Sequence, residues 1–182
     1  MKMNKLFLAG AMTLGLASFA HAADDQGSGE VKFVGAIIDA PCSISSDSVS
    51  QTVELGQIAQ KDLKDGARSE LVPFTIKLEQ CDFTAGKNKV RTTFTGVISA
   101  YATDKELLAI SGQASGAGIG IETFNNERLS LGEQSDAANL VGANHTLTYR
   151  AFLQGGLDAN GDSVEIVPGP FTAIANFQLA YE

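Results

Sequence analysis

The sequence lacks the residues on which most enzyme and metal sites are built. Its 182 residues include no tryptophan, two cysteines and two histidines, and one of those histidines falls in the N-terminal stretch described below. The other, His145, lies in an apparent strand with no cysteine or acidic partner nearby, so we interpret it as an exposed strand residue and not a catalytic base. The glycine-rich run at residues 112–120 fits neither a nucleophile elbow nor a dinucleotide fingerprint and is interpreted as a flexible turn. We therefore expect no catalytic residues, no cofactor and no metal.

A long apolar run is also missing. The longest, residues 6–19, is shorter than the roughly 18 residues that a membrane span needs, and glycine and serine interrupt it. Two lysines precede the run and the small-x-small sequence Ala20-His21-Ala22 follows it, which is typical of a secretory signal peptide over residues 1–22. Subtracting these 22 residues from 182 leaves a mature chain of 160, the size of one domain.

Positive charge is scarce as well. Removal of the two signal lysines leaves 11 basic residues against 21 acidic ones, so the formal charge of the mature chain is 11 minus 21, or −10. Such a surface repels phosphate groups, which argues against nucleic acid and anionic membranes as partners.

The two cysteines, Cys42 and Cys81, are expected to form a disulfide, because an exported chain with an even number of cysteines most often pairs them. In the chain-entropy model, closing a loop of about 40 residues stabilises the fold by roughly 4 kcal/mol. Cysteines so far apart, without companion histidines, are poor candidates for a metal or redox site.

Short runs with strand-like patterns fill most of the mature chain, and Gly, Asn, Asp and Ser clusters separate most of them. The predicted strands cover residues 31–39, 51–55, 71–79, 90–101, 118–124, 145–153, 163–167 and 171–181. Only residues 57–63 and 104–110 show helical signals, each of a turn or two. The pattern favours an all-β antiparallel sandwich. Residues 158–162 could suggest a calcium loop, but Gly161 is fourth and not sixth, so an Asn-Gly hairpin turn is favoured.

The last fourteen residues, 169–182, carry the clearest pattern. The apolar positions alternate along one face and comprise Phe171, Ala173, Ala175, Phe177, Leu179 and Tyr181. Polar residues take most of the intervening places, as in a half-buried strand. Because this strand comes at the end of the sequence, we expect its missing neighbour to come from earlier sequence or from another molecule.

The N-terminal extension has the pattern of a strand that inserts into a groove. Residues 23–29 are polar and glycine-rich, with little to hold them to their own domain. At strand period, one face carries Asp25, Gly27, Gly29, Val31 and Phe33, and the other carries Gln26, Ser28, Glu30 and Lys32. A shift by one residue would bury Lys32 in the groove, so we retain the register that presents Val31 and Phe33.

The segment Phe33-Val-Gly-Ala-Ile-Ile-Asp-Ala-Pro-Cys42-Ser-Ile-Ser45 closely resembles the first strand of fimbrial subunits assembled by the chaperone/usher route, especially rod subunits of the P-pilus type. In that family a glycine stands fourteenth from the end and a tyrosine is penultimate, and Gly169 and Tyr181 hold those places. With the signal peptide and the cysteine spacing, the resemblance covers essentially the whole mature chain.

The resemblance implies an incomplete immunoglobulin-like antiparallel sandwich that lacks its last strand and is completed in trans by a donor strand. Residues 23–34 would be the donor-strand extension and residues 35–182 the pilin domain. The donor residues would be Gly27, Gly29, Val31 and Phe33. The acceptor strand, to which the chaperone also binds, would comprise Gly169, Phe171, Ala173, Ala175, Phe177, Leu179, Tyr181 and Glu182. Asp25 departs from the bulkier or apolar residue that family members often have there.

The expected partners follow from the same resemblance. A periplasmic chaperone would lend a strand to the groove and hold the C-terminal carboxylate of Glu182, and at an outer-membrane usher the extension of the next subunit would replace it. Neighbouring copies and other fimbrial subunits would be the lasting partners, and the destination would be a fimbria on the cell surface. Neither nucleic acid nor direct membrane insertion is expected.

We therefore expect a structural subunit of an adhesive fimbria, without enzymatic activity, and favour the major rod subunit. A minor adaptor or terminator would look similar, although a terminator would lack a usable donor segment. A soluble secreted adhesin or binding module is the alternative from another class. It fits less well, because 160 residues leave no room for an additional lectin domain and no strand follows residues 171–181 to complete the fold.

Overall fold

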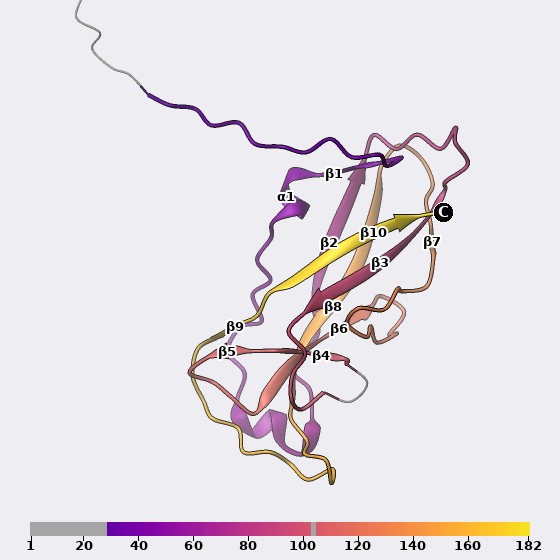
Figure 1. Ribbon diagram of the computed structural model, residues 1–182. Coiled ribbons are helices and arrows are strands. Elements are labelled where there is room, and N and C mark those ends of the chain that lie inside the picture. The colour runs from indigo at the N-terminus through magenta and orange to yellow at the C-terminus, as the bar shows by residue number, and fades with distance from the viewer. Residues whose placement is uncertain (1–28, 103–104) are drawn as a thin grey trace, which may run out of the picture. The chain divides into compact units, whose positions relative to one another are not determined.

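The structure is a computed structural model that describes residues 29–102 and 105–182 (Figure 1). The chain divides into a short N-terminal unit that ends at Ile37 and a folded unit from Ile38 to Glu182. The elements are β1 (Ser43–Ile44), α1 (Ser46–Val49), the 3₁₀ helix η1 (Gln60–Gly66), β2 (Val72–Glu79), β3 (Lys89–Gly96), β4 (Leu107–Ala109), β5 (Ser111–Gly112), β6 (Ala117–Thr123), β7 (Ala138–Asn139), β8 (His145–Gly155), β9 (Phe171–Thr172) and β10 (Ala175–Tyr181). No helix among these residues has both the length and the apolar character to cross a membrane.

The strands form two main sheets with only antiparallel pairs. One sheet has five strands in the order β1-β2-β8-β6-β4, and the other has three in the order β10-β3-β7. A small ladder of β5 with β9 forms a third. In Figure 1, β10 and β3 lie across β2 and β8. This arrangement confirms the all-β antiparallel sandwich expected from the sequence.

The core lies between the two main sheets. Alternate residues of β2, β3 and β8 point inward, and the buried cluster includes Ile76, Leu78, Val90, Phe94, Leu147 and Tyr149. The Phe94 and Tyr149 rings meet edge to face, with centroids 5.1 Å apart. The Tyr149 hydroxyl donates a hydrogen bond of 2.6 Å to Thr92 Oγ1, so the phenol is buried without leaving its polar atom unpaired. Burial raises the pKa of Tyr149, although the Thr92 bond acts in the opposite direction.

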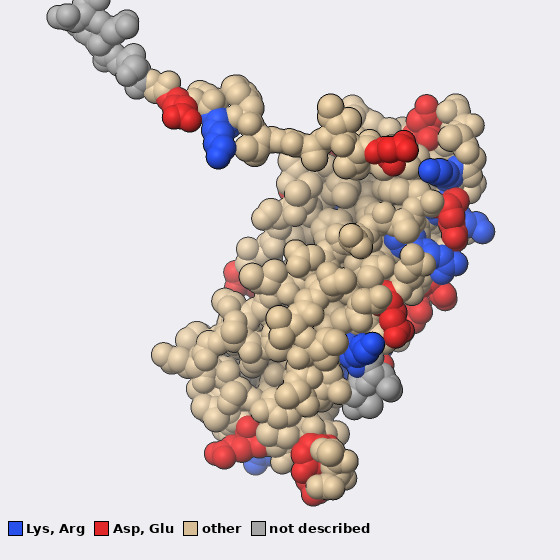
Figure 2. All heavy atoms as spheres, in the orientation of Figure 1, with Lys and Arg blue, Asp and Glu red and all other residues tan. Residues whose placement is uncertain are grey.

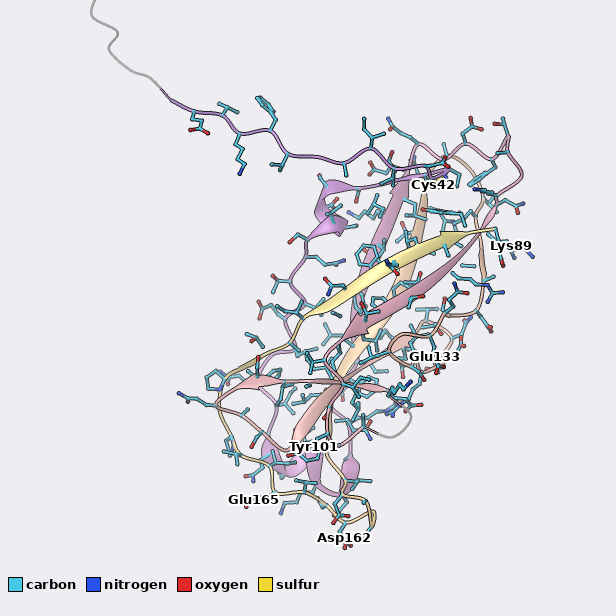
Figure 3. The ribbon with its side chains drawn as sticks, in the orientation of Figure 1. Cys42, Lys89, Tyr101, Glu133, Asp162 and Glu165 are labelled. Atoms are coloured by element: carbon cyan, nitrogen blue, oxygen red, sulfur yellow. A yellow bond between two sulfur atoms is a disulfide. The ribbon has the colours of Figure 1, made fainter. Side chains whose placement is uncertain are left out.

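The disulfide predicted from the sequence is confirmed. Cys42 and Cys81 are bonded, with their Cα atoms 4.1 Å apart (Cys42 is labelled in Figure 3). The bond joins the residue before β1 to a residue two positions beyond β2, next to the pairing of Ser43 with Glu79. Asp82 N also donates to Pro41 O at 2.8 Å. The chain is thus held at this edge by both covalent and hydrogen bonds.

Several predicted strands are absent or shorter than expected. Residues 31–39 and 51–55 form no strand, and residues 163–167 contribute only isolated bridges at Ser163 and Val167. The predicted strand at 90–101 ends at Gly96, and that at 171–181 is broken between β9 and β10. The alternating pattern was present in these segments, but a strand also needs a hydrogen-bonded neighbour along its length.

The two helical predictions have different outcomes. Residues 57–63 overlap η1, which buries Leu63. The helix predicted at 104–110 is wrong, because Leu107–Ala109 forms β4 and pairs with β6. Leu107 and Leu108 are both buried, so packing against the sheet overrides a weak local preference for helix.

The predicted turn at residues 158–162 is present. Gly161 has a φ of 85°, and its N–H donates to Asp158 O at 3.0 Å. Asp158 Oδ1 accepts hydrogen bonds from the N–H groups of Asn160 and Asp162, and these bonds lower the pKa of Asp158. Side chains within the described ranges nowhere gather three or more His, Cys, Asp or Glu in a metal-binding arrangement.

Candidate assembly site at the open edge of β10

β10 is an edge strand that is paired on one side only. Its whole length lies antiparallel to β3, from Ala175 opposite Gly96 to Tyr181 opposite Val90. Of the strands that the structure describes, none pairs with its other side. An edge of this kind is a template for one more strand.

The hydrogen-bond alternation shows which backbone groups face the open side. Glu182 and Lys89 exchange two bonds of 3.0 Å each. Because bonded and non-bonded pairs alternate along an antiparallel ladder, the even-numbered residues of β10 also bond to β3. The N–H and C=O groups of Phe177, Leu179 and Tyr181 therefore point away from β3, toward the open edge.

The same three residues turn their side chains toward the core. Phe177, Leu179 and Tyr181 pack on the buried cluster but stay only half-buried, whereas Asn176, Gln178 and Ala180 are exposed. The Phe177 ring lies 6.5 Å from that of Phe94, centroid to centroid. The alternation predicted from the sequence is thus present in β10, and its apolar face is incompletely covered. The two alanines differ, since Ala175 is exposed and Ala173 lies in the break before β10.

Tyr181 has an unusual hydroxyl group. Its oxygen is buried, and none of the described residues offers it a hydrogen bond. Burial also raises the pKa of Tyr181. A buried hydroxyl without a partner costs free energy, about 1–3 kcal/mol, so this end of β10 carries an unsatisfied polar group.

Gly169 precedes β9 at a place where no side chain fits. A Cβ atom there would lie 2.8 Å from Gln113 Cβ and 3.0 Å from Ala114 N. Gln113 N donates to Pro170 O at 3.0 Å, next to the pairing of Phe171 with Gly112. The glycine thus allows close approach of the β5 turn and positions the chain that leads into β10. Phe171 packs on a smaller apolar cluster around Leu63, away from the β10 face.

Glu182 lies just beyond β10. Its carboxylate Oε1 is 3.3 Å from Arg91 Nε, and its backbone bonds to Lys89. Both bonds hold the end of β10 against β3.

The predicted donor residues fall on the N-terminal unit. Gly27 lies outside the described residues, and the chain has no strand from Gly29 to Ile37. Val31 and Phe33 are 74% and 89% exposed. A Cβ atom at Gly29 would contact nothing within 4 Å. The described part of this unit, residues 29–37, therefore presents large apolar side chains that are mostly exposed.

Sequence reasoning missed a buried charge in β6. Glu122 is 1% exposed, and its carboxylate lies 2.7 Å from Arg150 Nη2 and 3.1 Å from Arg68 Nη1. Arg68 and Arg128 both stack on the ring of Phe152. The sequence signal that could have revealed this cluster was the acidic Glu122 within the otherwise apolar run at residues 118–124. The cluster links β6 and β8, away from β10.

His145, at the start of β8, is partly buried rather than exposed as the sequence analysis expected.

Charged side chains are sparse around β10. In Figure 2 the face that carries this strand is mostly tan, and the red and blue residues gather toward its margins. The backbone edge, the half-covered apolar face and the low charge together suit a strand-shaped protein partner and not a small polar ligand.

Comparisons with known proteins agree on one family. The family model described as Fimbrial protein matches residues 31–182. The Fimbria A protein of Serratia marcescens is 48% identical over 182 residues, covering 100% of both chains. The Major MR/P fimbria protein of Proteus mirabilis (strain HI4320) is 44% identical over 182 residues, again covering 100% of both.

Solved structures show the same fold. The crystal structure of the P pilus rod subunit PapA superposes with a TM-score of 0.67 at 29% identity, covering 79% of this chain and 100% of that one. A chain from the structure of a chaperone-usher pilus gives a TM-score of 0.72 at 32% identity, covering 86% and 97%. The immunoglobulin-like class expected from the sequence is therefore confirmed. This chain belongs to the fimbrial protein family.

Proposed function

We propose that this chain is the repeating rod subunit of a bacterial surface fimbria, and that its copies join by strand donation. Residues 23–34 of one copy would pair with the open edge of β10 in the next. The observation that carries the proposal is β10 itself, with backbone groups directed to an unpaired edge and an apolar face that is half-covered. Relatives named as fimbrial proteins, one of them a major fimbria protein, support the structural role.

The energetics favour a lasting joint. Burial of Val31 and Phe33, both exposed in the single chain, contributes roughly 1.5–3 kcal/mol each. The inserted strand would also bond to the amide groups of Phe177, Leu179 and Tyr181, which would otherwise promote uncontrolled edge pairing. Glycines at positions 27 and 29 suit a stretch of the partner where little space is left for side chains.

The same edge needs protection before assembly. A periplasmic chaperone that lends a strand to β10 and holds the carboxylate of Glu182 would keep exported subunits apart, and an outer-membrane usher would then exchange that strand for the next subunit. The destination is the extracellular fimbria. The protein's work is mechanical and structural, with no catalytic step, cofactor or metal.

Assembly of the mature chain tests the proposal. The variant V31D/F33D places charge on the apolar donor face, and we expect it to stay monomeric under conditions where the unaltered chain forms oligomers by light scattering. The variant Q26D/S28D adds the same two charges to the opposite face and should still assemble. Equal assembly of all three proteins would refute strand donation by this segment.

A further inference from the structure

The turn at residues 158–162 contains the only asparagine in the sequence that is followed by glycine. Asn160 and Gly161 are both exposed, in the loop where Figure 3 labels Asp162. Gly161 has a φ of 85°, in the left-handed region that favours glycine. A Cβ atom there would contact nothing within 4 Å, so solvent surrounds the pair. The backbone of the turn, and not crowding, therefore requires a glycine directly after Asn160.

An asparagine before a glycine can react without an enzyme. Asparagine is thermally labile because the backbone nitrogen of the next residue can attack its side-chain amide carbon, and glycine has no side chain to hinder the approach. Attack of Gly161 N on Asn160 Cγ would form a cyclic imide. The side-chain nitrogen leaves as ammonia and takes up the proton that Gly161 N gives up. Water then opens the ring at either carbonyl, which leaves aspartate or isoaspartate at position 160.

Asp158 holds both of the groups that would react. The Gly161 N–H donates to Asp158 O at 3.0 Å, which engages the attacking nitrogen. Asn160 Nδ2 lies 3.5 Å from Asp158 Oδ2, so the side-chain amide is directed toward this carboxylate. Asp158 Oδ1 also accepts bonds from the N–H groups of Asn160 at 2.8 Å and Asp162 at 2.9 Å. The folded turn thus restrains the two groups from meeting.

We propose that Asn160–Gly161 is a site of spontaneous deamidation and that Asp158 is the positioning residue that limits its rate by keeping the turn closed. The reactants are the Asn160 amide and water. The inference goes beyond the proposed function and does not depend on it, because the turn takes no part in the open edge of β10.

Local opening of the turn sets the rate. A reaction that needs the open turn proceeds in proportion to the fraction of time for which the turn is open. The bonds to Asp158 lower this fraction. They also lower the pKa of Asp158, so its carboxylate is ionised, and a negative charge beside Gly161 N opposes loss of the proton from that nitrogen. Both effects slow the reaction in the folded protein.

The product would weaken the turn that held the reaction back. Aspartate at position 160 would set a second carboxylate beside that of Asp158, and like charges repel. Isoaspartate would lengthen the backbone by one methylene group, which disturbs the pairing of Leu157 with Ser163 across the turn. Ser163 Oγ accepts a bond of 3.2 Å from Asp65 N, so the disturbance would reach η1.

Prolonged incubation of the mature protein in mildly alkaline buffer tests the site. By peptide mass spectrometry, we expect the peptide with Asn160 to gain the mass difference between an amide and an acid, and an isoaspartate-specific methylation assay should label the same peptide. Asn144 is exposed but is followed by His145, so its peptide is the internal control and should not change. N160Q should show no gain, because the longer side chain forms a ring more slowly. An unmodified Asn160 in a sample whose synthetic peptide of residues 156–165 has reacted would overturn the site.

Variants at position 158 test the control of the rate. D158A should deamidate about three- to tenfold faster than the unaltered protein, because the bonds from Asn160 and Asp162 are lost. D158S should restore most of the protection, since a serine hydroxyl accepts a similar bond in a turn. Equal rates for all three proteins would refute the role of Asp158. If D158A does not fold, the synthetic peptide replaces it as the open reference. The unaltered protein should then react more slowly than the peptide, and equal rates would refute protection by the turn.

Discussion

At the residue scale, Asp47 shows how an exposed carboxylate can make the fold sensitive to acid. Lys77 Nζ lies 2.7 Å from Asp47 Oδ2, and Ser45 Oγ donates to Asp47 Oδ1 at 2.7 Å. The Lys77 bond, followed by the Ser45 bond, lowers the pKa of Asp47 to about 2. Hydrogen bonds from Thr84 likewise lower the pKa of Asp82. All of these carboxylates favour the folded state when they are ionised.

Acid titration of D47N is therefore informative. A carboxyl with a depressed native pKa contributes stability above its unfolded pKa of about 3.9, and this contribution is lost as the pH falls through the native value of about 2. We expect D47N to melt below the unaltered protein at pH 6 and the gap to narrow between pH 4 and pH 2. Melts at a series of pH values measure this, and a gap that stays constant would contradict the assignment. Asp82 and Asp158 should leave some acid sensitivity in D47N.

At the element scale, the local sequence pattern predicts which residues can form a strand, and pairing with a neighbouring strand determines whether the strand forms. The alternation of apolar and polar residues located β2, β6, β8 and β10 because each has a hydrogen-bonded neighbour in the same sheet. The similar pattern at residues 51–55 has no strand partner, and Gln51 Nε2 reaches only Thr75 O. Which segments find a neighbour depends on long-range pairing that a single sequence does not reveal.

The candidate assembly site was likewise only partly predictable from the sequence. The inward face of β10 follows from strand period, so Phe177, Leu179 and Tyr181 were identified from the sequence. The break at residues 173–174 was not, because β9 turns aside to pair with β5. The buried hydroxyl of Tyr181 depends on three-dimensional packing and left no sequence signal.

The Cys42–Cys81 disulfide lies beside the pairing of β1 with β2 and is expected to stabilise it. We expect the free energy of unfolding of C42S/C81S to fall by about 2–5 kcal/mol, because the disulfide no longer restricts the unfolded chain. The two cysteines are separated by 39 positions in the sequence. Urea unfolding of C42S/C81S, compared with the unaltered protein whose disulfide is intact, measures the loss, and the unaltered protein in reductant should unfold at the same urea concentration as the variant. An unchanged urea midpoint would mean that the hydrogen bonds of β1 and Pro41 suffice on their own.

At the scale of the whole molecule, we propose that the folded unit and the N-terminal unit carry complementary parts of one sandwich, which two copies of the chain would complete together. The folded unit has a three-stranded sheet that ends at β10. In the described part of the N-terminal unit, residues 29–37, apolar side chains are exposed and no strand forms. The mature chain also has a formal charge of −10, so copies repel one another at long range. The proposed joining of copies would therefore depend on short-range strand pairing and apolar burial, which salt does not weaken.

A thermal melt of residues 35–182, with the disulfide intact, tests the incomplete fold most directly. The melt is recorded with and without a peptide spanning residues 23–34. We predict a large rise in melting temperature with the peptide, and none when Val31 and Phe33 in the peptide are replaced by aspartate. A domain that melts cooperatively at the same high temperature in all three samples would show that β10 needs no further strand, and would contradict assembly by strand donation.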